Sequence, residues 1–183
     1  AAGNASGWTD LEDFSVSRLH AWVPLIVRVP DGELPRCLDI IRNGGFEAGT
    51  AWVVNPPEGY DTYVYAPVHG GSRSARVGHD SAPYSSIRQQ VALPATGSAT
   101  LRLWHYPISE YNDPQDWQYI AVWDETGHTY YLEFVNSDAR QWLHKEFNLD
   151  DFKGQRITII IGATNDGDGN LTRAYVDDVE VEV

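Results

Sequence analysis

Aromatic side chains are the most chemically distinctive residues of this 183-residue chain, which contains 7 Trp, 10 Tyr and 5 Phe. A Trp or Tyr ring offers a flat apolar surface for stacking, and Arg, Asn, Gln, Asp and Glu offer planar hydrogen-bonding groups. Residues 109–117 combine both kinds, since Tyr111 and Trp117 flank amides and carboxylates. A long turn of this composition is typical of a ligand-binding loop. The aromatic residues therefore either fill a core or form stacking surfaces.

Catalytic residues are harder to identify. The six histidines show neither the H-E-x-x-H motif nor an i, i+2 pair of zinc ligands. No G-x-S-x-G elbow occurs, Cys37 lies in no protease signature, and Gly70 and Gly71 lack the lysine of a phosphate-binding loop. Because Glu110 and Glu133 could face one cleft, a jelly-roll glycosidase or lyase is the less favoured alternative to a non-catalytic protein.

The charge of the chain excludes two classes of partner. Its 13 Lys and Arg against 26 Asp and Glu give a net charge of -13, which repels phosphate backbones and anionic lipids. No segment approaches the roughly 20 apolar residues that a transmembrane helix needs. We therefore expect neither nucleic-acid binding nor membrane insertion. The single cysteine excludes an intramolecular disulfide.

The first 38 residues differ in pattern from the rest. They begin with small residues and contain an apolar run, Trp22 to Val27, that Pro24 interrupts. Proline removes a backbone donor, so such a run fits an edge strand better than a helix or a central strand. We expect residues 1–38 to form a linker with an edge strand, and residues 39–183 to form the main domain.

Short segments separated by turn residues follow from residue 43 onward, with almost no helical periodicity. This pattern predicts an all-β protein. About ten short strands at this spacing favour a two-sheet antiparallel β-sandwich of the jelly-roll type. The clearest strands are expected at residues 74–77, 86–93, 99–106, 118–124, 129–135, 142–148, 155–164 and 172–183, with at most one helical turn at 149–152.

Alternation within the strands separates a core side from an outward side. In residues 101–106 the leucines are expected in the core, with Trp104 and Tyr106 opposite. In residues 130–134 the expected core residues are Tyr130, Leu132 and Phe134. The candidate ligand-binding residues, on the outward side and its adjoining loop, are Arg76, Arg88, Arg102, Trp104, Tyr106, Tyr111, Trp117, Tyr119, Trp123, Tyr131 and Glu133.

Four segments carry a resemblance to a known family. They are N-G-G-F-E at residues 43–47 with Trp52 after it, G-G-S-R-S-A-R-V-G at 70–78, S-I-R-Q-Q-V at 86–91 and Y-V-D-D-V at 175–179. In this order the chain resembles the calcium-containing, galactose-binding-like jelly-roll carbohydrate-binding modules of secreted bacterial glycoside hydrolases and peptidases. The resemblance covers about residues 40–183 and implies a β-sandwich, a glycan ligand and secretion.

The resemblance also implies a structural calcium ion. A jelly roll places its first and last strands side by side, and carboxylates that converge there repel one another unless a hard cation lies between them. By similarity, the expected ligands are the carboxylates of Glu47 and Asp177 and the carbonyls of Asn43 and Ser72, with Asp178 as the alternative to Asp177.

A second calcium hypothesis concerns D-G-D-G-N at residues 166–170, which begins like an EF-hand loop. Leu171 occupies the sixth position, where the EF-hand requires Gly, and Asp177 replaces the glutamate at the twelfth. The segments on either side are expected strands and not helices. A solvated hairpin loop is therefore the favoured interpretation.

Together these patterns predict a non-catalytic carbohydrate-binding accessory domain of a secreted, extracellular protein. Its aromatic face would stack on a polysaccharide or glycan, because a sugar ring presents an apolar C–H face and polar hydroxyls. The alternative is a structural or protein-interaction domain, without a sugar site, that packs against neighbouring domains of a larger secreted protein such as a peptidase.

Overall fold

The structure is a computed structural model that describes residues 40–55, 61–79, 84–110 and 115–183. All of them belong to one compact unit, Cys37–Val183. The expected linker and edge strand at residues 1–38, and the candidate ligand residue Tyr111, lie outside the described residues, so both stay predictions.

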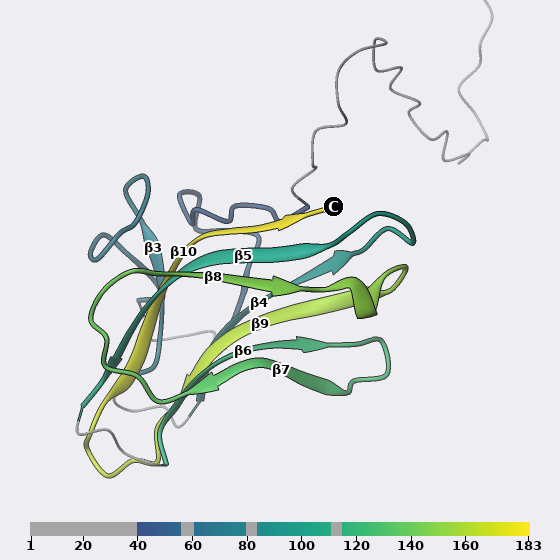
Figure 1. The fold of residues 1–183 in the computed structure, drawn as a ribbon. Helices are drawn as coiled ribbons and strands as arrows, with labels where there is room; N and C mark the ends of the chain where they lie inside the picture. The colour runs from purple at the N-terminus through teal and green to yellow at the C-terminus, as the bar shows by residue number, and fades with distance from the viewer. Residues whose placement is uncertain (1–39, 56–60, 80–83, 111–114) are drawn as a thin grey trace, which may run out of the picture. The chain divides into compact units, whose positions relative to one another are not determined.

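Within the described residues, ten strands form two antiparallel five-stranded sheets that pack face to face (Figure 1). The two-sheet antiparallel β-sandwich expected from the sequence is confirmed. We name each sheet by its central strand. The β9 sheet has the order β1(Val53–Asn55), β4(Tyr84–Ala92), β9(Arg156–Thr164), β6(Trp117–Trp123), β7(Thr129–Val135), and the β10 sheet the order β2(Tyr63–Val64), β3(Ser74–Val77), β10(Thr172–Glu182), β5(Thr100–Ser109), β8(Leu143–Asn148).

The core lies between the sheets and follows the alternation of the strands. In β5, Leu101 and Leu103 are fully buried, and their neighbours Arg102 and Trp104 point to the opposite side. Burying one such aliphatic side chain contributes about 1.5–3 kcal/mol. The only helical element among the described residues is the 3-10 turn Asp150–Phe152. No helix in the described ranges is long and apolar enough to cross a bilayer.

The first described segment lies beside the last strand, as the sequence predicts. The Val179 amide donates to the Gly44 carbonyl at 3.0 Å, and the Ile40 amide donates to the Val181 carbonyl at 3.2 Å. A Cβ atom on Gly44 would lie 1.8 Å from the Val179 carbonyl oxygen, so only glycine permits this approach. Residues 40–47 and β10 thus form a junction, although most of the chain separates them.

A register shift in β7 reverses part of the predicted alternation. Ile120 of β6 pairs with Glu133, whereas the next residue, Ala121, pairs with Tyr131, so Leu132 is an extra residue on β7. Such a bulge changes the face on which the following side chains lie. Glu133 therefore points between the sheets, and Phe134 points outward. Both predictions, Glu133 outside and Phe134 in the core, were wrong.

Candidate ligand-binding face

The outward face of the β9 sheet carries a dense set of aromatic side chains. Strand pairing aligns Trp117 with Thr164, Tyr119 with Gly162, and Ala121 with Ile160, so alternate residues of β6 share this face with β9. We call this surface the β9 face. The aromatic and charged residues that line its hollows are Tyr84, Arg88, Trp117, Tyr119, Trp123, Tyr131, Phe134 and Asp166.

A glycine sets the floor of this face. A Cβ atom on Gly162 would lie 2.4 Å from the Tyr119 hydroxyl oxygen and 2.8 Å from the Ser85 carbonyl oxygen. The Tyr119 ring therefore lies across β9, where its hydroxyl forms a hydrogen bond with Ser86 of β4. Burial raises the pKa of Tyr119, so the hydroxyl stays neutral. Tyr119 is a fixed part of the floor.

Stacked aromatic rings form one wall. Trp117 and Phe134 are nearly parallel, with ring centroids 4.6 Å apart and an interplanar angle of 22°. Tyr131 meets Phe134 edge-on at 5.0 Å. These rings remain open to solvent, because Tyr131 is 58% exposed and Phe134 is 44% exposed. Apolar rings that are held in place and yet exposed are suited to stacking on a ligand.

Two adjoining hollows make a groove along this face. One has a volume of about 260 Å³ and contains Arg88, Tyr119 and Trp123. The other has a volume of about 480 Å³ and contains Trp117 and Phe134. Tyr84 and Tyr131 line both, so the hollows lie next to each other. Their polar lining includes Asn55, Ser86, Gln115 and Asn165, which can bind hydroxyl groups.

The other predicted ligand residues lie on the opposite side of the sandwich. Arg76, Trp104 and Tyr106 point outward from the β10 sheet, as their pairing with β10 shows. Sequence alternation shows that a residue faces away from the core but not which sheet it belongs to. The prediction of one continuous face was therefore wrong. The four residues on the far side are Arg76, Arg102, Trp104 and Tyr106.

Aromatic residues of the β10 sheet are occupied by contacts within the protein. The His69 ring lies on Trp104 with centroids 3.9 Å apart and an interplanar angle of 16°. Trp142 meets both His69 and Tyr106 edge-on, and Tyr106 also meets Tyr175 edge-on. Because His69 already covers one side of Trp104, this cluster differs from the open rings of the β9 face.

Charged candidates away from the β9 face also have partners. Arg102 forms ion pairs with Glu146 and Glu182. Glu133, between the sheets, pairs with Lys145, and its other oxygen lies 4.0 Å from Nδ1 of the buried His105. Glu133 thus shares no surface with Tyr131, its predicted neighbour in the ligand site. This placement also separates Glu133 from the groove, where a paired-carboxylate glycosidase would need it.

The predicted metal ligands gather at the junction of residues 40–47 and β10. Glu47 accepts hydrogen bonds from the backbone amides of Ser72 and Arg73 and from the Ser72 hydroxyl, which at 2.6 Å is the main cause of the lowered pKa of Glu47. Asp178 lies beside Gly70 and contacts Nδ1 of His69 at 2.7 Å. The acidic side chains from both ends of the fold thus approach one glycine-rich loop.

Two of the predicted ligands fit a metal ion poorly. Asp177 is fully buried, and its oxygens accept hydrogen bonds from the amides of His69, Gly70 and Asp178. Burial nevertheless raises the pKa of Asp177. The Asn43 carbonyl already accepts hydrogen bonds from Trp52 Nε1 and an amide. Within the described ranges, no three His, Cys, Asp or Glu side chains are grouped closely enough to hold a metal ion.

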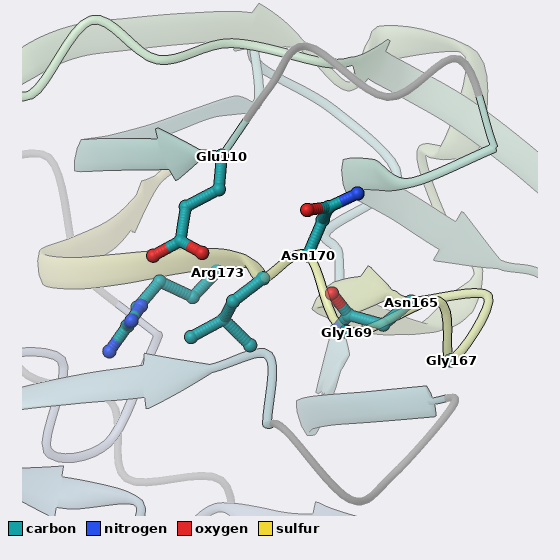
Figure 2. Close-up of a pocket in the computed structure, with 7 residues that line it drawn as sticks. Glu110, Asn165, Gly167, Gly169, Asn170 and Arg173 are labelled. Atoms are coloured by element: carbon teal, nitrogen blue, oxygen red, sulfur yellow. The ribbon is translucent and has the colours of Figure 1, made fainter.

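The turn at residues 166–170 borders a separate hollow of about 210 Å³ (Figure 2). Asp166 accepts a hydrogen bond from the Asp168 amide, and Asp168 accepts one from the Asn170 amide. These bonds close short turns in an exposed loop, as expected, but the loop joins β9 of one sheet to β10 of the other and is therefore not a hairpin. Glu110 and Arg173 line the other side of the hollow.

Some residues of the groove were missed from the sequence. Phe134 was assigned to the core because the bulge has no visible signal in the pattern. Tyr84 lies at the start of β4, two residues before the predicted strand, and is exposed in the groove. Asn55 belongs to a strand of three residues, too short for alternation to reveal. Of these residues, only Tyr84 could have been found from the sequence, because it lies just before a predicted strand.

Two sheets with a grooved aromatic outer face define a β-sandwich of the type found in carbohydrate-binding modules. No family model matches the chain, and no curated protein is similar in sequence. Among solved structures, TmCBM61 in complex with β-1,4-galactotriose has a TM-score of 0.58 and 21% identity, covering 79% of this chain and 97% of that one.

Further structures show the same architecture. A family 16 carbohydrate-binding module has a TM-score of 0.52 and 18% identity over 78% of this chain and 98% of its own. The C-terminal family 22 module of Clostridium thermocellum Xyn10B has a TM-score of 0.54 and 14% identity, over 76% and 91%. TmCBM61 and these two structures are carbohydrate-binding modules. At these identities the similarity establishes the fold.

Proposed function

We propose that this chain is a non-catalytic carbohydrate-binding module and that the groove of the β9 face binds a polysaccharide or oligosaccharide. The observation that carries this proposal is the groove itself. It joins exposed, fixed aromatic rings to amide, hydroxyl and guanidinium groups. A sugar presents one apolar C–H face and a rim of hydroxyls, and the groove offers both complements.

The role of each groove residue follows from its position. Trp117, supported by Phe134 at 4.6 Å, supplies the stacking surface. Tyr119 forms the floor over Gly162, and its buried hydroxyl remains a neutral hydrogen-bonding group. Exposed Tyr131 closes one side. Because these residues come from adjacent strands of one sheet, the site is held in place without ligand.

Isothermal calorimetry against a panel of plant and microbial oligosaccharides tests this function. We expect Trp117→Ala to weaken binding of the best ligand by about tenfold or more, since buried aromatic contacts dominate such interfaces. Trp104→Ala is the matched control: it removes the ring that His69 covers, so binding should change little.

The alternative is a structural domain whose aromatic face packs against a neighbouring domain. Exposed Tyr84, Tyr131 and Phe134 are also what a protein interface would present. Absence of binding across the glycan panel by a correctly folded protein would favour this alternative. Loss of binding in Trp104→Ala, with Trp117→Ala unchanged, would move the sugar site to the β10 sheet. Secretion of the protein remains part of the proposal.

We also propose a structural calcium ion at the junction, held by Glu47 and Asp178. Support comes from the approach of both carboxylates to the adjacent Gly70 and Gly71, where a Cβ atom would lie 2.8 Å from Asp178 Oδ2 and 2.2 Å from Glu47 Oε1. Asp178, whose side chain is 42% exposed, is the better candidate than the fully buried Asp177. An ion there would hold together the two ends of the fold.

A further inference from the structure

Among the residues that the structure describes, Arg88 brings the only charge to its end of the groove. The hollow that contains it is otherwise lined by aromatic, apolar and neutral polar side chains, among them Tyr84, Tyr119 and Ser86. No Asp or Glu of the described residues forms an ion pair with Arg88. On the opposite sheet, by contrast, Arg102 is held by Glu146 and Glu182. The half-buried guanidinium of Arg88 therefore lies in the groove without a carboxylate partner among the described residues.

Trp123 holds the guanidinium of Arg88 in place. The Arg88 Cζ atom lies 5.4 Å from the centroid of the Trp123 ring, a cation–π distance. Contact with a ring uses the face of the planar guanidinium and leaves its N–H groups at the edge. These N–H groups have the spacing to bind both oxygens of a planar carboxylate. Arg88 is thus oriented for an anionic group before any ligand arrives.

The net charge of the protein repels anions, so a preference for an anionic ligand has to come from a local group such as Arg88. The chain has a net charge of -13, with 26 acidic residues against 13 Lys and Arg. In such a chain, an arginine in a ligand groove without an acidic neighbour is a local exception. The adjoining hollow has Asp166 as its only charged lining residue. The groove therefore has a positive end at Arg88 and a negative end at Asp166.

We propose that the groove prefers a glycan containing uronic acid, with the sugar carboxylate bound by Arg88. This inference rests on the proposed function and adds the chemical class of its ligand. The uronic acid unit lies in the hollow of Arg88 and Trp123, and neutral units continue over Trp117 towards Asp166. An ion pair formed in a partly desolvated groove discriminates strongly against a neutral sugar of the same shape.

Calorimetry with matched oligosaccharides tests the preference. A galacto-oligosaccharide that contains one galacturonate unit and the neutral galacto-oligosaccharide of equal length serve as probes, at low and at moderate salt. We expect the wild-type protein to bind the uronate about tenfold more tightly at low salt, with a smaller ratio at higher ionic strength. Arg88→Gln should bring the ratio of uronate affinity to neutral-ligand affinity close to one, because it removes the ion pair that only the uronate forms.

Arg76→Gln is the matched control, because it removes one positive charge from the opposite sheet. It should leave the ratio unchanged. Equal affinity for both probes in the wild-type protein, or a preference that survives Arg88→Gln, would overturn the inference while the proposed function stands. A sulfated galacto-oligosaccharide without uronic acid is compared in the same way. If it binds more tightly than the uronate, the assignment of a carboxylate as the group bound by Arg88 is wrong. The proposed function itself would be wrong if none of the probes binds and Trp117→Ala also has no effect on binding of the wider glycan panel.

Discussion

Tyr119 lies so close to Gly162 that a methyl group on the glycine would stand 2.4 Å from the tyrosine hydroxyl oxygen. Real Cβ atoms do not approach oxygen so closely, and the backbone carbonyl of Ser85, at 2.8 Å, blocks the other direction. Two central strands of the β9 sheet thus depend on each other: β9 provides the space, and β6 fills it with a ring that forms the groove floor.

Gly162→Ala should therefore destabilise the fold and weaken glycan binding together. We expect a loss of about 1–3 kcal/mol in the free energy of unfolding, as for overpacked cores, measured by urea denaturation. Gly45→Ala is the control, since its Cβ would have its nearest neighbour at 3.6 Å, an ordinary contact. A Gly162→Ala variant as stable as the wild type would contradict the close approach.

His105 should make stability fall at mildly acidic pH. Burial between the sheets, together with the nearby charge of Lys145, lowers the pKa of His105 to about 3 from the model-peptide value of 6.5. Glu133 lies 4.0 Å away, but Lys145 offsets its charge. Between these pKa values the unfolded chain binds a proton that the folded protein excludes, so stability is fully present above pH 6.5 and decreases below it.

Between pH 7 and pH 5, His105 is expected to lower the free energy of unfolding by about 2 kcal/mol. Urea denaturation at several pH values measures it. His105→Gln should lower stability at pH 7 yet reduce the slope between pH 7 and 5, whereas the exposed His144→Gln should retain the wild-type slope. Equal slopes for the His105 variant and the wild type would show that His105 is not the titrating group.

Gln118 should be essential for joining the two sheets. Its side chain is fully buried on β6, and its Nε2 donates to the carbonyls of Ile108 at the end of β5 and of Ser137, each at 3.0 Å. Its Oε1 accepts from the Ser137 amide at 2.9 Å. Gln118→Ala leaves these backbone groups without a partner, at a cost of about 3 kcal/mol. The exposed Gln90→Ala should cost less than about 0.5 kcal/mol.

Calcium should raise the melting temperature if Glu47 and Asp178 bind it. A ligand at about 100 times its dissociation constant stabilises a protein by about 2.7 kcal/mol, which is a shift of several degrees for a domain of this size. We expect the shift on adding calcium to chelator-treated protein, and its absence in Glu47→Gln. The exposed Asp151→Asn controls for lost charge. Identical melting curves in chelator and in calcium would reject the ion.

Much of the fold was predictable because strand alternation is a local property. The segments 74–77 and 129–135 were predicted with their observed bounds, and six further strands within two or three residues at each end. Strands β1 and β2 were missed, since two or three residues carry no measurable period. The junction was predictable from the two end motifs, and Val179 does donate to Gly44.

The ligand face was predictable only in part, because alternation says nothing about which sheet a strand joins. Trp104 and Trp123 have the same pattern in sequence, yet they lie on opposite sheets of the sandwich. Whether a ring is open also depends on segments far away: His69 covers Trp104 from a loop 35 positions earlier in the numbering. Such contacts are properties of the assembled structure.

The single extra residue at Leu132 reverses the alternation of side chains between the two faces of β7. It exchanges the destinations of the next two side chains, so that an acid enters the interior and a phenyl ring reaches the groove wall. Deleting one residue there would turn Glu133 outward and Phe134 inward, although no other residue would be substituted. The set of side chains that line the groove is therefore determined by strand length as well as by residue identity, so an insertion inside a strand changes the surface that the groove presents.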